Sequence, residues 1–227
     1  MNSSKISRDP SGTAFFMLLL TLTIQSDGQT NSGVSTNQFL YQDFAMSEVK
    51  LKNGQTQLYL INYNTISEKM AYKKDNKIYD VINPESVDTV FIQGSKFVPV
   101  NDAFFEILLV APMTFFIQHK GELISAGTPA GYGGTSQVAS TKVLSSISFS
   151  HGTYNLALPP EYNVRIDPVY WVRKDNIMSN FKNQKQFLNL FAAKESELKQ
   201  FIKHKHIRFD NKSDMVELAG YTNSIVR

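Results

Sequence analysis

The chain has 227 residues, a formal net charge of +3 at pH 7 and no cysteine. The lack of cysteine excludes disulfides, thiolate catalysis, iron–sulfur clusters and thiolate zinc sites. A hydrophobic fraction of 42%, with 10 Tyr and 16 Phe, predicts a folded chain with a core of its own, and the small net charge does not favour nucleic acid as a partner.

The N-terminus has the order of charge and hydropathy that is typical of a cleavable secretory signal peptide. Lys5 and Arg8 precede an uncharged apolar stretch, residues 14–24. As a helix this stretch rises about 16 Å, which is too short for a hydrocarbon core of roughly 30 Å. The small residues Ser26 and Gly28 predict cleavage after Gly28, and the alternative is a buried N-terminal helix. We therefore expect export, and no cysteine is present to carry a lipoprotein anchor.

Composition and periodicity divide the chain into four segments. Residues 1–28 are the predicted signal peptide, 29–38 a polar flexible lead-in, 39–173 a β-rich domain and 174–227 a helical C-terminal unit. The predicted fold class is α+β, a β-rich antiparallel sandwich or partly open barrel followed by a small C-terminal helical unit. No second apolar stretch approaches about 18 residues, so we expect no transmembrane segment in the mature chain.

Alternating side chains and closely spaced turns predict the β-rich domain. Asn53-Gly54 lies between two alternating stretches and predicts a hairpin, because both residue types tolerate positive φ. Residues 103–110 and 114–119 are predicted to be central strands rather than a short core helix, from their length and aromatic content. Pro99 has no backbone donor, so its strand is expected to lie at an edge or to end there.

In the C-terminal segment the apolar period changes to that of helices. Apolar residues recur at one-, three- and four-residue steps around Phe187, Leu198 and Met215, which predicts amphipathic helices. Ser213 is the candidate N-cap of the last helix, because its hydroxyl can accept a hydrogen bond from a backbone N–H of the first turn.

A glycine-rich segment is the strongest candidate for contact with a ligand or partner. It consists of Gly131, Tyr132, Gly133, Gly134, Thr135, Ser136 and Gln137. Glycine lets a ligand approach the backbone closely, and exposed loops often carry function. The segment has neither Gly-Lys-Ser/Thr nor the GxGxxG spacing, so it matches no phosphate-binding loop. The alternative interpretation is a plain connector.

The catalytic hypothesis is a hydrolase with Ser136 as nucleophile and His151, or else His119, as base. The surrounding GGTSQ lacks the GxSxG elbow, and spacing alone assigns no carboxylate to the third position. Glu106 lies within an apolar stretch, where it is either a buried acid with a raised pKa or a side chain satisfied by a hydrogen bond or an edge position.

Histidine and lysine are concentrated near the C-terminus. On a helix, the side chains of His204 and His206 point about 200° apart and no third ligand is close, so no metal site and no cofactor are expected. Residues 172–227 contain 11 Lys or Arg against 6 Asp or Glu. The candidate partners of this basic segment are an anionic lipid surface or an acidic polymer, and a simple solvated face is the alternative.

Seven short segments form a pattern that extends over nearly the whole mature chain. They are LKNG (51–54), LINYN (60–64), VDTVFIQGSKFVPV (87–100), FFEIL (104–108), AGYGGTSQ (130–137), YWVRKD (170–175) and KQFLNLFAAKESELKQFIKHKHIRF (185–209). Together they resemble a family of exported proteins, without a known activity, from bacteria of the Bacteroidetes group. The resemblance spans about residues 40–224. It implies a periplasmic or outer-envelope location in a Gram-negative bacterium, and it implies no cofactor or catalytic residue.

These observations favour an exported, non-catalytic binding module. We expect its partner to be an envelope protein or polymer, bound through residues 131–137 or through an exposed strand edge. The alternatives are a hydrolase of envelope polymer or peptide that uses Ser136 and His151, and a carrier of a small apolar ligand in the β core. The oligomeric state is left open.

Overall fold

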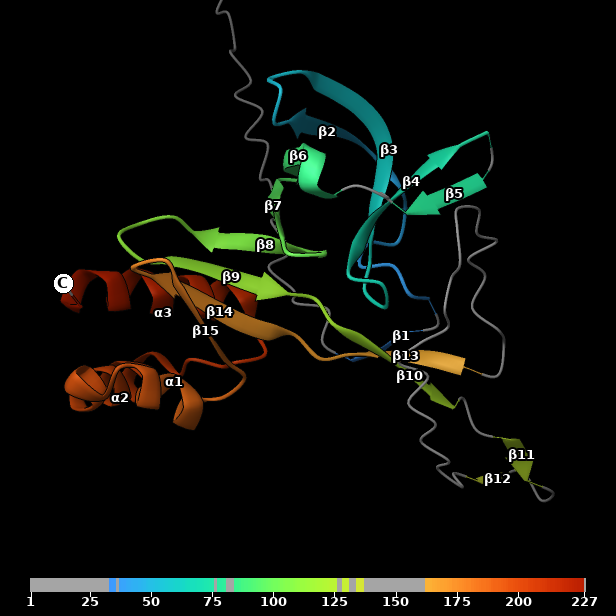
Figure 1. Ribbon diagram of the computed structural model, residues 1–227. Helices are drawn as coiled ribbons and strands as arrows, with labels where there is room; N and C mark the ends of the chain where they lie inside the picture. Colours follow the sequence, from blue (N-terminus) through green and yellow to red (C-terminus); the bar gives the residue numbers. More distant parts are fainter. Residues whose placement is uncertain are drawn as a thin grey trace, which may run out of the picture.

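A computed structural model describes residues 33–35, 37–75, 77–80, 84–125, 128–130, 134–136 and 162–226. These residues form a β-rich protein in which a ten-stranded antiparallel sheet is followed by three C-terminal helices (Figure 1). The predicted α+β class, β-rich with a small C-terminal helical unit, is confirmed. The predicted signal peptide, residues 1–28, lies outside the described residues.

Hairpins between consecutive strands make up most of the large sheet. Its spatial order is β15 (Ile177–Phe181), β14 (Val169–Lys174), β9 (Thr114–Gln118), β8 (Ala103–Leu109), β7 (Ser95–Val100), β6 (Val87–Ile92), β2 (Ala45–Leu51), β3 (Thr56–Asn64), β4 (Lys69–Lys74) and β5 (Lys77–Asp80). Two further antiparallel pairs, β14–β9 and β6–β2, join three runs of hairpins into one sheet.

Two smaller sheets extend from the large one. One contains β1 (Gly33–Ser35), β13 (Tyr162–Ile166) and β10 (Gly121–Ser125), and the other pairs β11 (Thr128–Ala130) with β12 (Gly134–Ser136). β10 follows directly on β9 and β13 leads directly into β14, so the β9–β14 pair continues into the three-stranded sheet (Figure 1).

The C-terminal unit covers one face of the β9–β14–β15 end of the sheet (Figure 1). It contains α1 (Gln184–Leu190), α2 (Glu195–Lys205) and α3 (Lys212–Ile225), with a short 3-10 turn, Ala192–Lys194, between α1 and α2; a second such turn, Pro84–Ser86, precedes β6. Within the described ranges, no helix combines the length and the apolar character that a membrane crossing requires.

The predicted N-cap of α3 is wrong. Asn211 caps this helix: its backbone is extended and its Oδ1 accepts a hydrogen bond from the Asp214 N–H at 3.0 Å. Ser213 therefore lies inside the first turn, where its backbone is already helical. Asn and Ser are comparable caps, so the residue types alone did not distinguish a helix start two residues earlier.

Turn chemistry explains why a strand, β15, lies within the segment that was predicted to be helical. Asp175 and Asn176 have φ of 49° and 62° and connect β14 to β15 as a two-residue turn. Positive φ at both positions matches the twist of a hairpin, and Asp and Asn tolerate it better than other side chains. β15 thus lies in the range 174–227, where we expected helices, and the first α helix begins at Gln184.

The hairpin predicted at Asn53-Gly54 is confirmed as β2–β3. Of the two residues only Gly54 has positive φ, 85°, and its N–H donates to the Leu51 carbonyl at 2.9 Å. The two apolar stretches beginning near residues 103 and 114 are strands β8 and β9, as predicted. The strand with Pro99, β7, lies between β6 and β8 rather than at an edge, and it ends one residue after Pro99, at Val100. Pro99 lies beyond Phe97, the last residue of β7 that pairs with β6.

Two separate apolar clusters form the described core. The first joins the helices to β9, β14 and β15 and includes Phe115, Ile117, Tyr170, Phe181, Phe187, Leu198 and Leu218. The second lies among β2, β3, β4, β6, β7 and β8 and includes Ile61, Tyr63, Met70, Val90, Phe97 and Phe104. β8 contributes to both, because Phe104 belongs to the second cluster and Leu108 packs against the first.

Close packing at the junction of β9 and β10 gives a test of this fold. A Cβ at Gly121 would lie 2.5 Å from Thr65 Oγ1 and 2.8 Å from Val164 Cγ1, whereas a Cβ at Gly220 in α3 would meet nothing within 4 Å. We expect Gly121→Ala to lower the free energy of unfolding by about 1–3 kcal/mol through overpacking. Gly220→Ala, the control, should raise it by about 0.5–1 kcal/mol through helix propensity. Urea unfolding measures both, and equal effects would contradict the described junction.

Candidate functional site

The structure describes only part of the predicted glycine-rich site. Gly134, Thr135 and Ser136 form β12, in which Ser136 lies opposite Thr128 of β11. The other members of the segment, Gly131, Tyr132, Gly133 and Gln137, and the candidate base His151 lie outside the described residues. The pairing of Ser136 with His151 therefore stays a hypothesis.

The histidines of the C-terminal unit are exposed. His204 lies in the last turn of α2, and His206 is its C-cap residue with φ of 54°. Across the described ranges, no three His, Cys, Asp or Glu side chains gather in a way that could hold a metal ion.

Glu106 is a buried acid with a histidine and a lysine as its partners. Its side chain is 2% exposed, and it lies on β8 between the two apolar clusters. His119, 3% exposed, donates from Nε2 to Glu106 Oε2 at 2.7 Å. Lys212, the first residue of α3, pairs through Nζ with the other carboxylate oxygen and also donates to Ser95 Oγ at 3.1 Å.

These partners determine the ionisation of Glu106. Burial raises the pKa of the carboxyl, but the His119 hydrogen bond and the positive charges of His119 and Lys212 outweigh it and lower the pKa from 4.5 to about 2. The sequence allowed a buried acid with a raised pKa; the acid is buried and hydrogen-bonded, and its pKa is shifted in the opposite direction. Because the carboxylate of Glu106 and the imidazole of His119 are buried, we assign the cluster to the attachment of α3 to the sheet rather than to catalysis.

An open groove lies where the β3–β4 turn meets β8, β9 and β14. Its volume is about 410 Å³, and its walls include Glu68, Asn101, Phe105, Gln118 and Trp171. The chain contains 1 Trp, and it is this one. The groove thus combines aromatic surface with carboxylate and amide groups.

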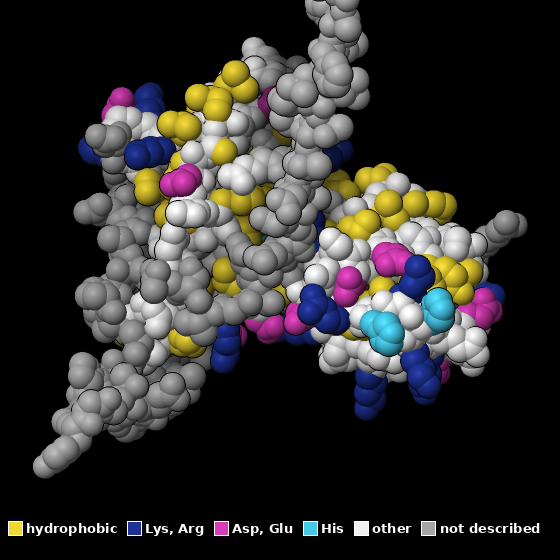
Figure 2. All heavy atoms as spheres, turned by 180° about the vertical axis from the view of Figure 1, so that it is seen from behind, with side chains coloured by type: hydrophobic (Ala, Val, Ile, Leu, Met, Phe, Trp, Pro, Cys, Tyr) yellow, Lys and Arg dark blue, Asp and Glu magenta, His cyan; other side chains and the backbone are white. Residues whose placement is uncertain are grey.

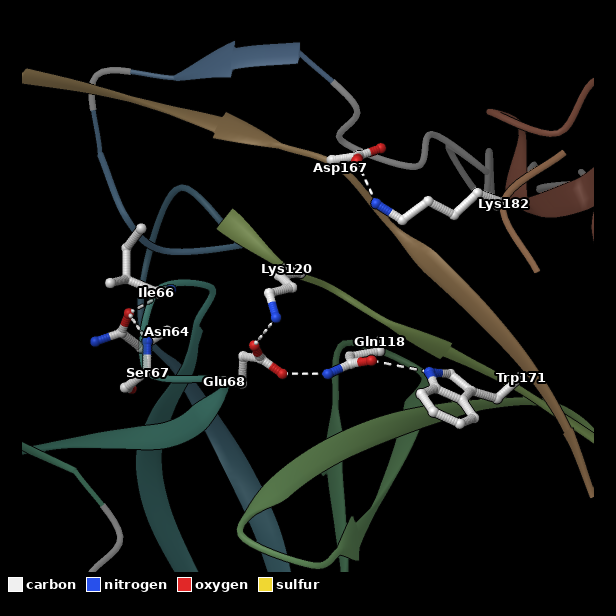
Figure 3. A network of polar contacts seen from close by, with 9 residues as sticks. All are labelled: Asn64, Ile66, Ser67, Glu68, Gln118, Lys120, Asp167, Trp171 and Lys182. Carbon is white, nitrogen blue, oxygen red and sulfur yellow. Dashed lines mark hydrogen bonds and ion pairs between the residues drawn. The ribbon is translucent and has the colours of Figure 1, made fainter. Parts of the chain in front are cut away.

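A chain of polar contacts crosses the groove wall (Figure 3). Trp171 donates from Nε1 to Gln118 Oε1 at 2.8 Å, and Gln118 donates from Nε2 to Glu68. Lys120 Nζ lies 3.4 Å from the second oxygen of the Glu68 carboxylate. The indole donor determines which end of the amide is oxygen, so the orientation of Gln118 is defined by its two partners.

The backbone of the β3–β4 turn holds Glu68 in place. Asn64 Oδ1 accepts from the N–H groups of Ile66 and Ser67 at 3.0 and 3.3 Å (Figure 3). Glu68 itself has φ of 58°, and its carbonyl accepts from the Phe104 N–H at 2.9 Å. Left-handed backbone is unfavourable for glutamate, so the turn keeps this side chain at the groove at some conformational cost.

An aromatic layer supports the groove from inside the sheet. Trp171 lies opposite Phe116 in the β14–β9 pair, and its ring centroid is 5.5 Å from that of Phe105. The neighbouring residues in β14, Tyr170 and Val172, point to the other face and pack against the helices. One face of these strands therefore carries the helices, and the other carries the groove.

Sequence reasoning missed this groove. Gln118 and Trp171 are each adjacent in sequence to buried core residues. This alternation is typical of a strand that has one face in the core and the other face directed outward. That signal identifies outward side chains, but it does not say that residues 53 positions apart are hydrogen-bonded neighbours.

Comparisons with known proteins found no match among protein-family models, curated proteins or solved structures. The resemblance to exported Bacteroidetes proteins stays a prediction, and the groove has to be interpreted from its own residues.

The Lys212–Glu106 contact predicts a large penalty for removing one partner. Lys212→Met should lower the free energy of unfolding by about 2 kcal/mol, because the buried carboxylate loses its charged partner from α3 and keeps only the hydrogen bond from His119. Lys174→Met, at an exposed position at the end of β14, is the control and should change it by less than about 0.5 kcal/mol. Urea unfolding at neutral pH measures both, and similar values would contradict the anchoring role.

The lowered pKa of Glu106 predicts acid sensitivity. Since this pKa is about 2 in the folded chain against 4.5 ordinarily, its contribution to stability is complete above about pH 4.5 and is lost as the pH falls towards 2. Glu106→Gln should therefore flatten the loss of stability in this window, by up to about 3 kcal/mol. Urea midpoints at a series of pH values measure it, with Glu85→Gln, at an exposed position, as the control. If the stability of Glu106→Gln falls with pH in parallel with that of the unchanged chain, the lowered pKa is not assigned to Glu106.

Proposed function

We propose that this chain is an exported, non-catalytic binding module of the bacterial envelope, and that its groove at Trp171 holds a segment of a polyhydroxylated polymer, a glycan strand. The observation that carries the proposal is the joint placement of the Trp171 indole, the Gln118 amide and the Glu68 carboxylate in an open groove. The signal-peptide pattern at the N-terminus supports the envelope location.

The indole of Trp171 is oriented for stacking. Its only hydrogen-bond donor is used by Gln118, so the ring offers apolar π surface to a ligand rather than a polar edge. A sugar ring has a face of C–H groups that can lie on such a surface through weak C–H contacts. Phe105 packs beside the indole and supports it from β8.

The polar groups of the groove match the hydroxyls of a sugar. The Glu68 carboxylate and the Gln118 amide each keep lone pairs or N–H groups beyond those used between them. Asn101 and Asp102 of the β7–β8 turn line the same groove. Two neighbouring hydroxyls of a sugar can each donate and accept a hydrogen bond. A carboxylate, with two oxygens, or an amide, with one oxygen and one NH₂ group, can therefore bind both hydroxyls at once.

The location of the acid–base pair supports binding rather than hydrolysis. Glu106 and His119 are buried and are not among the residues that line the groove. A general acid or base has to reach the reacting bond directly or through one water, and neither side chain is exposed to do so.

The single tryptophan provides the test. Soluble oligosaccharides from bacterial envelope glycans should change the fluorescence of Trp171 in a saturable manner, because binding removes water from its ring. Glu68→Gln should weaken the affinity roughly tenfold through loss of a charge-assisted hydrogen bond. Glu122→Gln, at an exposed carboxylate of β10, is the matched control and should leave the affinity unchanged.

Calorimetry of Trp171 variants completes the experiment. Trp171→Phe should keep most of the affinity, and Trp171→Ala should lose at least tenfold, because only the former retains a stacking surface. If none of the oligosaccharides changes the emission at millimolar concentration, or if Trp171→Ala binds them as well as the unchanged chain, the proposal fails.

A further inference from the structure

A second groove lies on the helical unit, away from Trp171. Its volume is about 460 Å³, and it is lined by Gln184 of α1, by Lys199, Ile202 and Lys203 of α2, and by the residues that follow α2, His206 and Ile207. Ile202 and Ile207 are buried and form its apolar floor. The remaining lining groups are two ammonium groups, an imidazole and an amide, and no carboxylate lines the groove.

The cations of this groove differ from most of the others of the helical unit. Lys182, Lys194, Lys205, Arg208 and Lys212 each have a carboxylate partner within 4.0 Å. Among the described residues, Lys199 and Lys203 form no such ion pair. They are four positions apart on α2, where side chains are neighbours and like charges repel each other. Their positive charge is therefore uncompensated at the groove.

Figure 2 shows the surface of the helical unit, where histidine side chains lie beside Lys and Arg side chains and acidic side chains lie around them. A solvated helix face also carries lysines. It does not explain why two lysines without an ion-pair partner line the same groove as a histidine and an amide donor.

We propose that the groove formed by Gln184, Lys199, Lys203 and His206 binds a phosphate group. Ammonium groups bind phosphate as point charges, and the amide of Gln184 and the imidazole of His206, which line the same groove, supply further hydrogen-bond donors. The floor of Ile202 and Ile207 is apolar, so the anion makes charge-assisted contacts only at the rim of the groove. A phosphate ester, whose carbon atoms can contact this floor, therefore fits better than inorganic phosphate. Such a group occurs on soluble phosphorylated compounds and in phospholipid headgroups.

The test compares two double variants with the same change in net charge. Lys199→Gln with Lys203→Gln removes the two ammonium groups of the groove, and Lys73→Gln with Lys74→Gln removes two exposed lysines of β4 at the other end of the sheet. The first probe is glycerol phosphate, added at constant ionic strength while the thermal midpoint is measured. The second is co-sedimentation with vesicles of phosphatidylglycerol and phosphatidylcholine, against vesicles of phosphatidylcholine alone.

We expect glycerol phosphate to raise the midpoint of the unchanged chain and of the β4 variant, and to leave that of the α2 variant unshifted. Co-sedimentation with the anionic vesicles alone, lost in the α2 variant only, would support the phosphate site and assign its source to lipid. Absence of both effects in the unchanged chain overturns the proposal. An equal loss in the two variants also overturns it, because the attraction would then be a general effect of net charge.

Discussion

The buried carboxylate of Glu106 is the constraint on which the arrangement of sheet and helices depends. An isolated charge between two apolar clusters would be strongly unfavourable, so its partners have to be delivered by neighbouring elements. His119 comes from the end of β9 and Lys212 from the start of α3. The far end of α3 is held by Asn223, which exchanges hydrogen bonds with the backbone of Met113 at 2.9 and 3.0 Å. The helix is thereby attached to the sheet at both ends.

This attachment divides the strands β8, β9 and β14 between two tasks. Their helix-facing side chains pack in the first apolar cluster, and their opposite side chains form the proposed glycan groove. A groove built on strands that are packed on the other side loses little conformational entropy when a ligand binds. The contacts from Trp171 through Gln118 and Glu68 to Lys120 orient the side chains further before any ligand arrives (Figure 3).

The two proposed sites differ in chemistry because they lie on different kinds of surface. Alternation along a strand places single aromatic and amide side chains at fixed separations, which suits a sugar ring. The spacing of three to four residues along α2 instead brings Lys199 and Lys203 together, which suits an anion. The sheet is thus proposed to recognise a glycan, and the helical unit a phosphate group.

The sequence by itself determined the features that depend on neighbouring residues. The Asn53-Gly54 hairpin, the two apolar strands before and after Pro112, and the helical periods around Phe187 and Leu198 were all predictable, because turn chemistry and side-chain alternation act over a few positions. Where two local signals of equal strength compete, the boundary was misplaced, as with the cap of α3.

Only the tertiary structure decided the two contacts that matter most for function. Glu106 meets Lys212 from 106 positions away, and Trp171 meets Gln118 from 53 positions away. The Trp171–Gln118 contact depends on the β14–β9 pairing, and the Glu106–Lys212 contact depends on where α3 lies on the sheet. Non-local pairing is selected by the burial of whole faces rather than by any one residue, so the local pattern around these side chains carries no record of their partners.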